Sequence, residues 1–79
     1  MRIADTIPHA SMRIIIYALE KYHYVEFEAG PMKQGFRFSK EQVPGVDNIK
    51  KVISPQFITE VEERFLQMQK QALAALKNG

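Results

Sequence analysis

The 79-residue chain contains no cysteine, and neither sign of charge dominates it. Without thiols it can form neither a disulfide framework nor a thiolate zinc site, the usual supports of a domain this small. The 11 basic and 9 acidic residues leave a net charge of +2, whereas nucleic-acid-binding domains usually carry a clustered basic excess. We therefore expect the domain to be stabilised by packing or by association with another chain.

Long apolar runs are also missing. The longest uninterrupted run extends from Ile14 to Leu19, far short of the roughly 20 residues that cross a bilayer. The N-terminal residues, from Met1 to Pro8, lack the apolar core of a signal peptide. These absences predict a cytoplasmic protein without membrane association.

Three runs rich in β-branched and aromatic residues lie between residues 11 and 39. They are separated by Glu20-Lys21 and Gly30-Pro31, each of which can form a two-residue hairpin loop. The sequence therefore predicts a three-stranded antiparallel meander. Residues 1–10 are expected to form an extended lead-in, because Pro8 disfavours a helical conformation at the residue before it.

Two-residue loops fix the register of the meander, and this register separates two kinds of side chain. Because side chains alternate between the faces of a sheet, the inner face collects most of the strand hydrophobics: Ile14, Ile16, Val25, Phe27 and Phe36. The outer face collects favourable cross-strand neighbours: Arg13 opposite Glu28, Glu28 opposite Lys33, Tyr17 opposite Tyr24, and Tyr24 opposite Arg37. A slip of one residue would scramble both faces, so their consistency supports the register.

Two helices are predicted after Val43-Pro44-Gly45, which ends the sheet. Residues 46–53 form the short one. Residues 54–77 form a long amphipathic helix that begins at Ser54-Pro55, a favoured N-cap and first helical residue. Its core stripe consists of Ile58, Val61, Phe65, Met68, Ala72 and Leu76. The predicted fold is α+β, a single domain over residues 1–79 with the long helix packed on the inner sheet face. Because the helix is longer than the strands, its last turns should overhang them.

Two surfaces remain for a partner. Leu66 and Leu73 lie off the core stripe of the long helix; they are either isolated exposed leucines, which are common, or a helix-mediated contact, most simply of a homodimer. The second surface is the outer sheet face, with Ile15, Tyr17, Leu19, Tyr22, Tyr24 and Arg37. Aromatics beside an arginine are typical of protein interfaces and of folds that stack single-stranded bases. Alternatively, residues 1–10 or the short helix cover this face.

No pattern in the sequence predicts a catalytic, cofactor or metal site. The two histidines, His9 and His23, lack the cysteines or the close acidic cluster of a zinc site. His23 falls on the inner face, where a buried, hydrogen-bonded ring is expected. Glu26 and Glu28 point to the same side of one strand, but Arg13 and Lys33 beside them predict surface ion pairs rather than an acid–base pair. We therefore expect a non-enzymatic protein.

Three stretches of the chain are distinctive in combination: Ile7-Pro8-His9, Glu28-Ala29-Gly30 through Gln34 and Phe36-Arg37-Phe38, and Gln56-Phe57 through Phe65 and Met68. Together they resemble a group of small uncharacterised bacterial proteins, which carries no assigned activity, so the resemblance implies none. The order of three strands and a helix is also similar to the double-stranded-RNA-binding domain. That family's first helix is missing here, and Ser54-Pro55-Gln56-Phe57 stands where its basic cluster opens the last helix. Its function is therefore not carried over.

The leading hypothesis is a protein-interaction module that binds a protein partner or itself, through the outer sheet face, the long helix or both. The alternative is weak single-stranded nucleic-acid binding through Tyr17, Tyr24, Arg37 and Lys33. Nearby Glu26 and Glu28 would repel phosphate, which disfavours this alternative.

Overall fold

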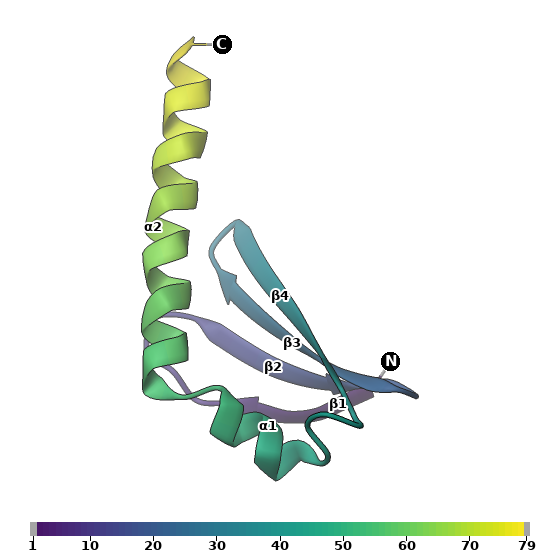
Figure 1. Ribbon diagram of the computed structural model, residues 1–79. Helices are drawn as coiled ribbons and strands as arrows, with labels where there is room; N and C mark the ends of the chain where they lie inside the picture. Colours follow the sequence, from purple (N-terminus) through teal and green to yellow (C-terminus); the bar gives the residue numbers. More distant parts are fainter. Residues whose placement is uncertain (1, 79) are drawn as a thin grey trace.

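A four-stranded antiparallel sheet and two helices make up the computed structural model, which describes residues 2–78 (Figure 1). The strands are neighbours in the order in which they occur in the sequence: β1 (Arg2–Ile7), β2 (Arg13–Ala18), β3 (Tyr22–Ala29) and β4 (Met32–Ser39). Helices α1 (Val46–Val52) and α2 (Pro55–Asn78) follow. The α+β class is confirmed.

The register of β2, β3 and β4 agrees with the register predicted from the sequence. Ile14 pairs with Phe27 and Val25 pairs with Phe36. Three residues lie between β2 and β3, and two lie between β3 and β4. In the first connection the backbone N–H of Leu19 donates to the carbonyl oxygen of Tyr22 at 3.0 Å, which leaves the predicted pair Glu20-Lys21 as the turn. In the second, Gly30 has φ 59° and precedes Pro31, as a hairpin turn with glycine at its first central position requires.

The prediction of three strands is wrong, because the N-terminal segment is not a lead-in outside the sheet. Residues Arg2–Ile7 form β1, which pairs with β2 and places Ile7 opposite Ile14. A register shift between Ile3 and Asp5 interrupts the pairing, so the segment does not show the strict alternation by which strands are recognised in a sequence. Because it lies beside β2, it also covers what would otherwise be an unpaired strand edge.

The core lies between the inner sheet face and the two helices. The sheet contributes fully buried side chains from β2 and β3, and the helical segment contributes Ile49, Ile53, Val61 and Phe65. Phe57 joins the layers: its ring centroid is 5.8 Å from that of Phe27 and 5.0 Å from that of Phe36.

Helix α1 is held in place by one apolar and one charged contact. Ile49 is completely buried in the core, and Lys50 forms an ion pair with Asp5 of β1. The hydrogen bond from Lys50, and a second from the backbone N–H of Thr6, lower the pKa of Asp5. Because of the register shift in β1, Asp5 pairs with the inward-facing Ile16. Paired residues lie on the same face of a sheet, so the Asp5 carboxylate points towards the helical layer.

Only the N-terminal half of α2 packs on the sheet. The predicted overhang of the last turns is confirmed, but the prediction of a long helix packed along one sheet face is wrong in part. Val61 and Phe65 are buried and Met68 is half-buried, but every side chain from 69 to 77 is exposed. Figure 1 shows the helix rising away from the sheet, with its C-terminal half alongside no other element. The radius of gyration is 14.2 Å, against about 12 Å for a compact chain of this length.

Candidate functional site

A row of exposed leucines begins at Leu66, near the middle of α2, and continues along the projecting half of the helix. Leu66, Leu73 and Leu76 are 60%, 54% and 78% exposed. With Gln69 they recur at intervals of three, four and three residues, so all four side chains lie within about 80° of one another around the helix. We call these four residues the leucine stripe. An i, i+3, i+7, i+10 spacing is the pattern of a helix that pairs with another helix.

The sequence identified only part of this stripe. Leu66 and Leu73 are exposed, as the interpretation of a helix-mediated contact required, but Leu76 and Ala72, which were assigned to the core stripe, are exposed as well. The assignment fails because the helix has left the sheet before these residues, and no described part of the chain lies opposite them. The three-four spacing from Leu66 to Leu76 was the signal that could have found the complete stripe.

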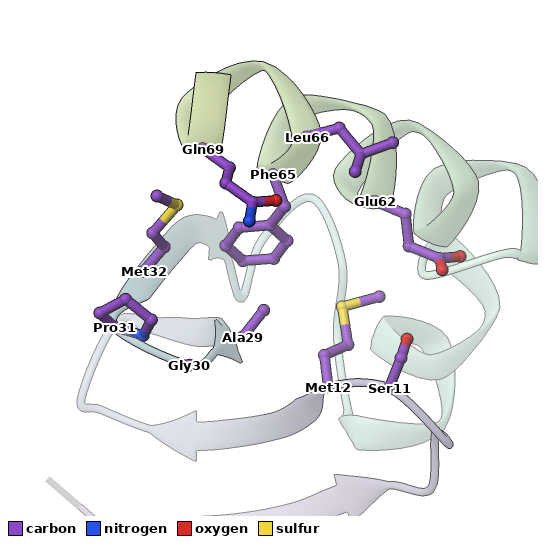
Figure 2. A pocket seen from close by; sticks show the side chains of 10 residues that line it. All are labelled: Ser11, Met12, Ala29, Gly30, Pro31, Met32, Glu62, Phe65, Leu66 and Gln69. Atoms are coloured by element: carbon purple, nitrogen blue, oxygen red, sulfur yellow. The ribbon is translucent and has the colours of Figure 1, made fainter. Parts of the chain in front are cut away.

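A cavity of about 510 Å³ adjoins the leucine stripe, in the wedge between α2 and the tip of the β3–β4 hairpin (Figure 2). Phe65 projects from α2 towards its centre, and Met12 and Met32 form the opposite side (Figure 2). Leu66 and Gln69 belong both to the stripe and to the cavity wall. The complete lining is Ser11, Met12, Ala29, Gly30, Pro31, Met32, Glu62, Phe65, Leu66 and Gln69. Exposed leucines and an apolar hollow therefore form one continuous surface.

The acidic residues of this part of α2 lie at one end, together with the basic Arg64, and the projecting half carries only basic charges. Glu62 and Glu63 lie towards the cavity end, whereas Lys70 and Lys77 lie on the projecting half. The Glu62 carboxylate is 3.8 Å from Nε2 of His9. Glu63, Lys70 and Lys77 are all exposed, and none of them forms a salt bridge within the described chain.

On the outer sheet face, the aromatic residues and the arginine that the sequence assigned to a candidate interaction surface contact one another in pairs. The rings of Tyr17 and Tyr24 stack with their centroids 6.1 Å apart, and the Arg37 guanidinium lies 5.2 Å from the centroid of the Tyr22 ring. A shallow hollow of about 280 Å³ lies among Leu19, Tyr22, Tyr24 and Arg37. Ile15 is half-buried between Thr6 and Glu26 on the neighbouring strands.

The two expected covers of the outer face do not lie over it. Strand β1 continues the sheet beside β2, and α1 packs on the inner side through Ile49. The predicted ion pairs do occupy one end of the outer face: Glu28 is 3.7 Å from Arg13 and 3.6 Å from Lys33, and Glu26 is 3.9 Å from Lys33. The aromatic residues of this face therefore contact mainly one another, beside a cluster of balanced charge.

His23 is buried as predicted, but its predicted hydrogen bond is not formed. The residue is 5% exposed, and its Nδ1 has no hydrogen-bond partner in the described part of the chain. Burial, and secondarily the charge of Lys40, lower the pKa of His23. His9 differs: its Nδ1 accepts a hydrogen bond from the backbone N–H of Ser11 at 3.1 Å. Between residues 2 and 78, no three His, Asp or Glu side chains gather as metal ligands would.

Neither helix of residues 2–78 is long and apolar enough to cross a membrane. Comparison of the chain with protein-family models, with curated proteins and with solved structures finds no significant match. The resemblance to small bacterial proteins stays a prediction. Function is therefore inferred from the surfaces of the molecule itself.

Proposed function

We propose that this chain is a non-enzymatic interaction module that self-associates through the projecting half of α2. The observation that carries this proposal is the leucine stripe, in which three leucines are more than half exposed. Single exposed leucines need no explanation, but a row of three on one side of a helix, interrupted only by Gln69 and beside an apolar hollow, is typical of a surface that binds a partner.

The energetics favour a second copy of modest affinity. Covering the exposed part of each leucine contributes roughly 1–2 kcal/mol, so the six leucines of two copies contribute on the order of 10 kcal/mol. The loss of translational and rotational freedom on association costs about 4–15 kcal/mol. The gain exceeds the cost by a few kcal/mol at most, and we expect a weak dimer with a dissociation constant of about 0.1–1 mM.

The secondary structure of the projecting half gives a second reason. Helical segments shorter than about 12–15 residues are marginal in water without tertiary contacts, and residues 69–77 have every side chain exposed. The side of α2 opposite the leucine stripe is polar, with Gln67 and Gln71, and Lys70 lies at its flank. A partner on the apolar side would stabilise the helix and leave its polar side in water.

Light scattering over a range of protein concentrations tests the proposal. We expect the average mass to rise from that of the monomer, 9.1 kDa, towards twice that value. The double variant Leu66→Gln with Leu73→Gln should remain monomeric at every concentration. Its matched control is Ala74→Gln, which introduces the same side chain next to Leu73 on the polar side of the helix and should dimerise as the parent does. A parent chain that stays monomeric to millimolar concentration would contradict the proposal.

Single-stranded nucleic-acid binding is the second candidate, and the hollow beside Tyr22 and Arg37 is the observation that favours it. Aromatic rings beside a guanidinium can stack an unpaired base. Two features oppose it: Tyr17 and Tyr24 already stack on each other, and Glu26 lies beside Tyr17, with its carboxylate 3.5 Å from the Tyr17 hydroxyl. Titration with a fluorescent oligonucleotide at low and high salt separates the candidates, because binding to phosphates weakens steeply as salt is added. Absence of salt-sensitive binding removes this candidate.

A further inference from the structure

We propose that the two α2 helices pair antiparallel, so that the C-terminal turn of each helix reaches the cavity of the other copy. This inference rests on the proposed function, and specifies the orientation and register of the same contact. The leucine stripe determines the register, the distribution of charge determines the orientation, and the cavity shows where the end of the partner helix lies.

The register follows from the spacing of the stripe. In an antiparallel pair, side chains at alternate core positions meet in layers whose residue numbers have a constant sum. Such a pairing places Leu66 opposite the partner's Leu76 and Gln69 opposite the partner's Leu73. The two-fold axis then repeats both layers. Each layer contains at least one leucine, and the single polar member, Gln69, lies at the edge of the cavity.

The charges favour this orientation. Glu63 precedes the first leucine of the stripe, and Lys77 follows the last one. In the antiparallel register Glu63 flanks the same edge of the pair as the partner's Lys77, so two Glu–Lys contacts form across the dimer. They outnumber the one like-charge contact of this edge, between the two copies of Lys70 at the two-fold axis. In a parallel pair, residues with the same number lie side by side, and Glu63 and Lys77 stay about 21 Å apart along the axis.

The cavity lies where this register would place the C-terminal end of the partner's α2. Because Leu66 lines both the stripe and the cavity, the partner's Leu76 opposite it comes to the cavity mouth, near Phe65. The two sheets then lie at opposite ends of the helix pair and do not obstruct each other. A parallel pair would bring both sheets to the same end and leave both cavities without an occupant.

Charge reversal tests the orientation at exposed positions that the fold does not use. We expect Glu63→Lys and Lys77→Glu each to weaken dimerisation, on the order of fivefold in the dissociation constant, because each creates two like-charge contacts. The double variant should recover the affinity of the parent chain. In a parallel dimer these residues do not meet, so the effects of the two changes would simply add. Additive effects would overturn the inference and leave self-association intact.

Disulfide formation gives an independent readout, since the chain has no cysteine of its own. Two single variants are needed, Leu66→Cys and Leu76→Cys, each first shown by light scattering to dimerise under reducing conditions. On oxidation of a mixture, the antiparallel register predicts the mixed disulfide, because identical positions lie about 15 Å apart along the axis. A parallel pair predicts disulfides within each variant alone and would overturn the inference. Loss of dimerisation in the parent chain would instead overturn the proposed function, so the two failures are distinguishable.

Discussion

The ring of Tyr24 lies over Gly35 on the neighbouring strand. A Cβ atom built on Gly35 would overlap the Tyr24 hydroxyl and come within 2.6 Å of its ring carbon Cε1. Tyr24 pairs with Arg37 and Gly35 pairs with Glu26, so this contact is diagonal across the two strands. The missing side chain at Gly35 gives Tyr24 the space in which it stacks on Tyr17.

Gly35→Ala should therefore displace the Tyr24 ring and disrupt its stacking on Tyr17. We expect a loss of about 1 kcal/mol in the free energy of unfolding, the size of a favourable cross-strand pair, measured by urea denaturation. Near-ultraviolet circular dichroism reports the ring displacement directly. In a Tyr24→Ser background the same glycine replacement should stabilise the fold, because glycine within a strand costs about 0.5–1 kcal/mol relative to alanine. Equal effects in both backgrounds would show that the ring does not depend on Gly35.

The unpartnered ring of His23 should make stability depend on pH. Its pKa is lowered in the folded state by burial and, secondarily, by Lys40, whereas in the unfolded chain it titrates near its ordinary value of about 6.5. Below about pH 6.5 the unfolded state therefore takes up the proton more readily, and the stability present at higher pH is lost as the pH falls towards the folded-state pKa. Urea denaturation on either side of this range, near neutral pH and in mild acid, measures this loss.

His23→Phe should abolish most of that pH dependence. Near neutral pH it should leave stability unchanged or raise it by up to about 1 kcal/mol, because no hydrogen bond is lost and an unsatisfied buried nitrogen is removed. The matched control is His9→Gln, at the other histidine of the chain. A pH dependence that persists in His23→Phe and disappears in His9→Gln would contradict this account.

Ser54 should stabilise the start of α2 as an N-cap. Its Oγ accepts a hydrogen bond from the backbone N–H of Phe57 at 3.2 Å, and its carbonyl oxygen accepts one from the N–H of Ile58 at 3.0 Å. Ser54→Ala removes the first bond, and we expect a loss of about 1 kcal/mol. Ser54→Asp keeps an acceptor at the helix N-terminus and should retain most of the stability. Thermal unfolding of both variants measures the difference, and equal losses would mean that the side chain does not cap.

The parts of this fold that leave a local pattern in the sequence could be predicted. The residue pairing of the β2–β3 and β3–β4 hairpins could be predicted because short turns and the alternation of side chains are local features of the sequence. Pairs such as Val25 and Phe36 follow from them. Strand β1 could not, because residues 8–12 join it to β2 without a two-residue turn and its bulge hides the alternation. Ser54 marked the start of α2 correctly, again through a local signal.

The candidate site was less predictable for a similar reason. The helical period placed Phe65 and Leu76 on one stripe, since periodicity records the direction of a side chain but not whether anything lies opposite. Phe65 lies against the sheet and is buried, whereas Leu76 lies in the projecting part of the helix and is exposed. A long-range hydrogen bond that no sequence pattern signals also joins the sheet to α2, from Gln34 to the backbone of Val61.

The hydrogen bond between Gln34 and Val61 joins β4 to the packed part of α2. Gln34 lies on the inner face opposite Phe27, and its Nε2 donates to the carbonyl oxygen of Val61 at 2.9 Å. Gln34→Leu removes the bond, and we expect a loss of about 1 kcal/mol in the free energy of unfolding. The matched control is Gln67→Leu on the exposed side of α2, which should change stability by less than about 0.5 kcal/mol. Because the bond joins β4 to α2, Gln34→Leu should also change the helix direction, and so weaken dimerisation more than Gln67→Leu does. Small-angle scattering of the monomer measures the direction, and an unchanged radius of gyration with full dimer affinity would show that apolar packing alone orients α2.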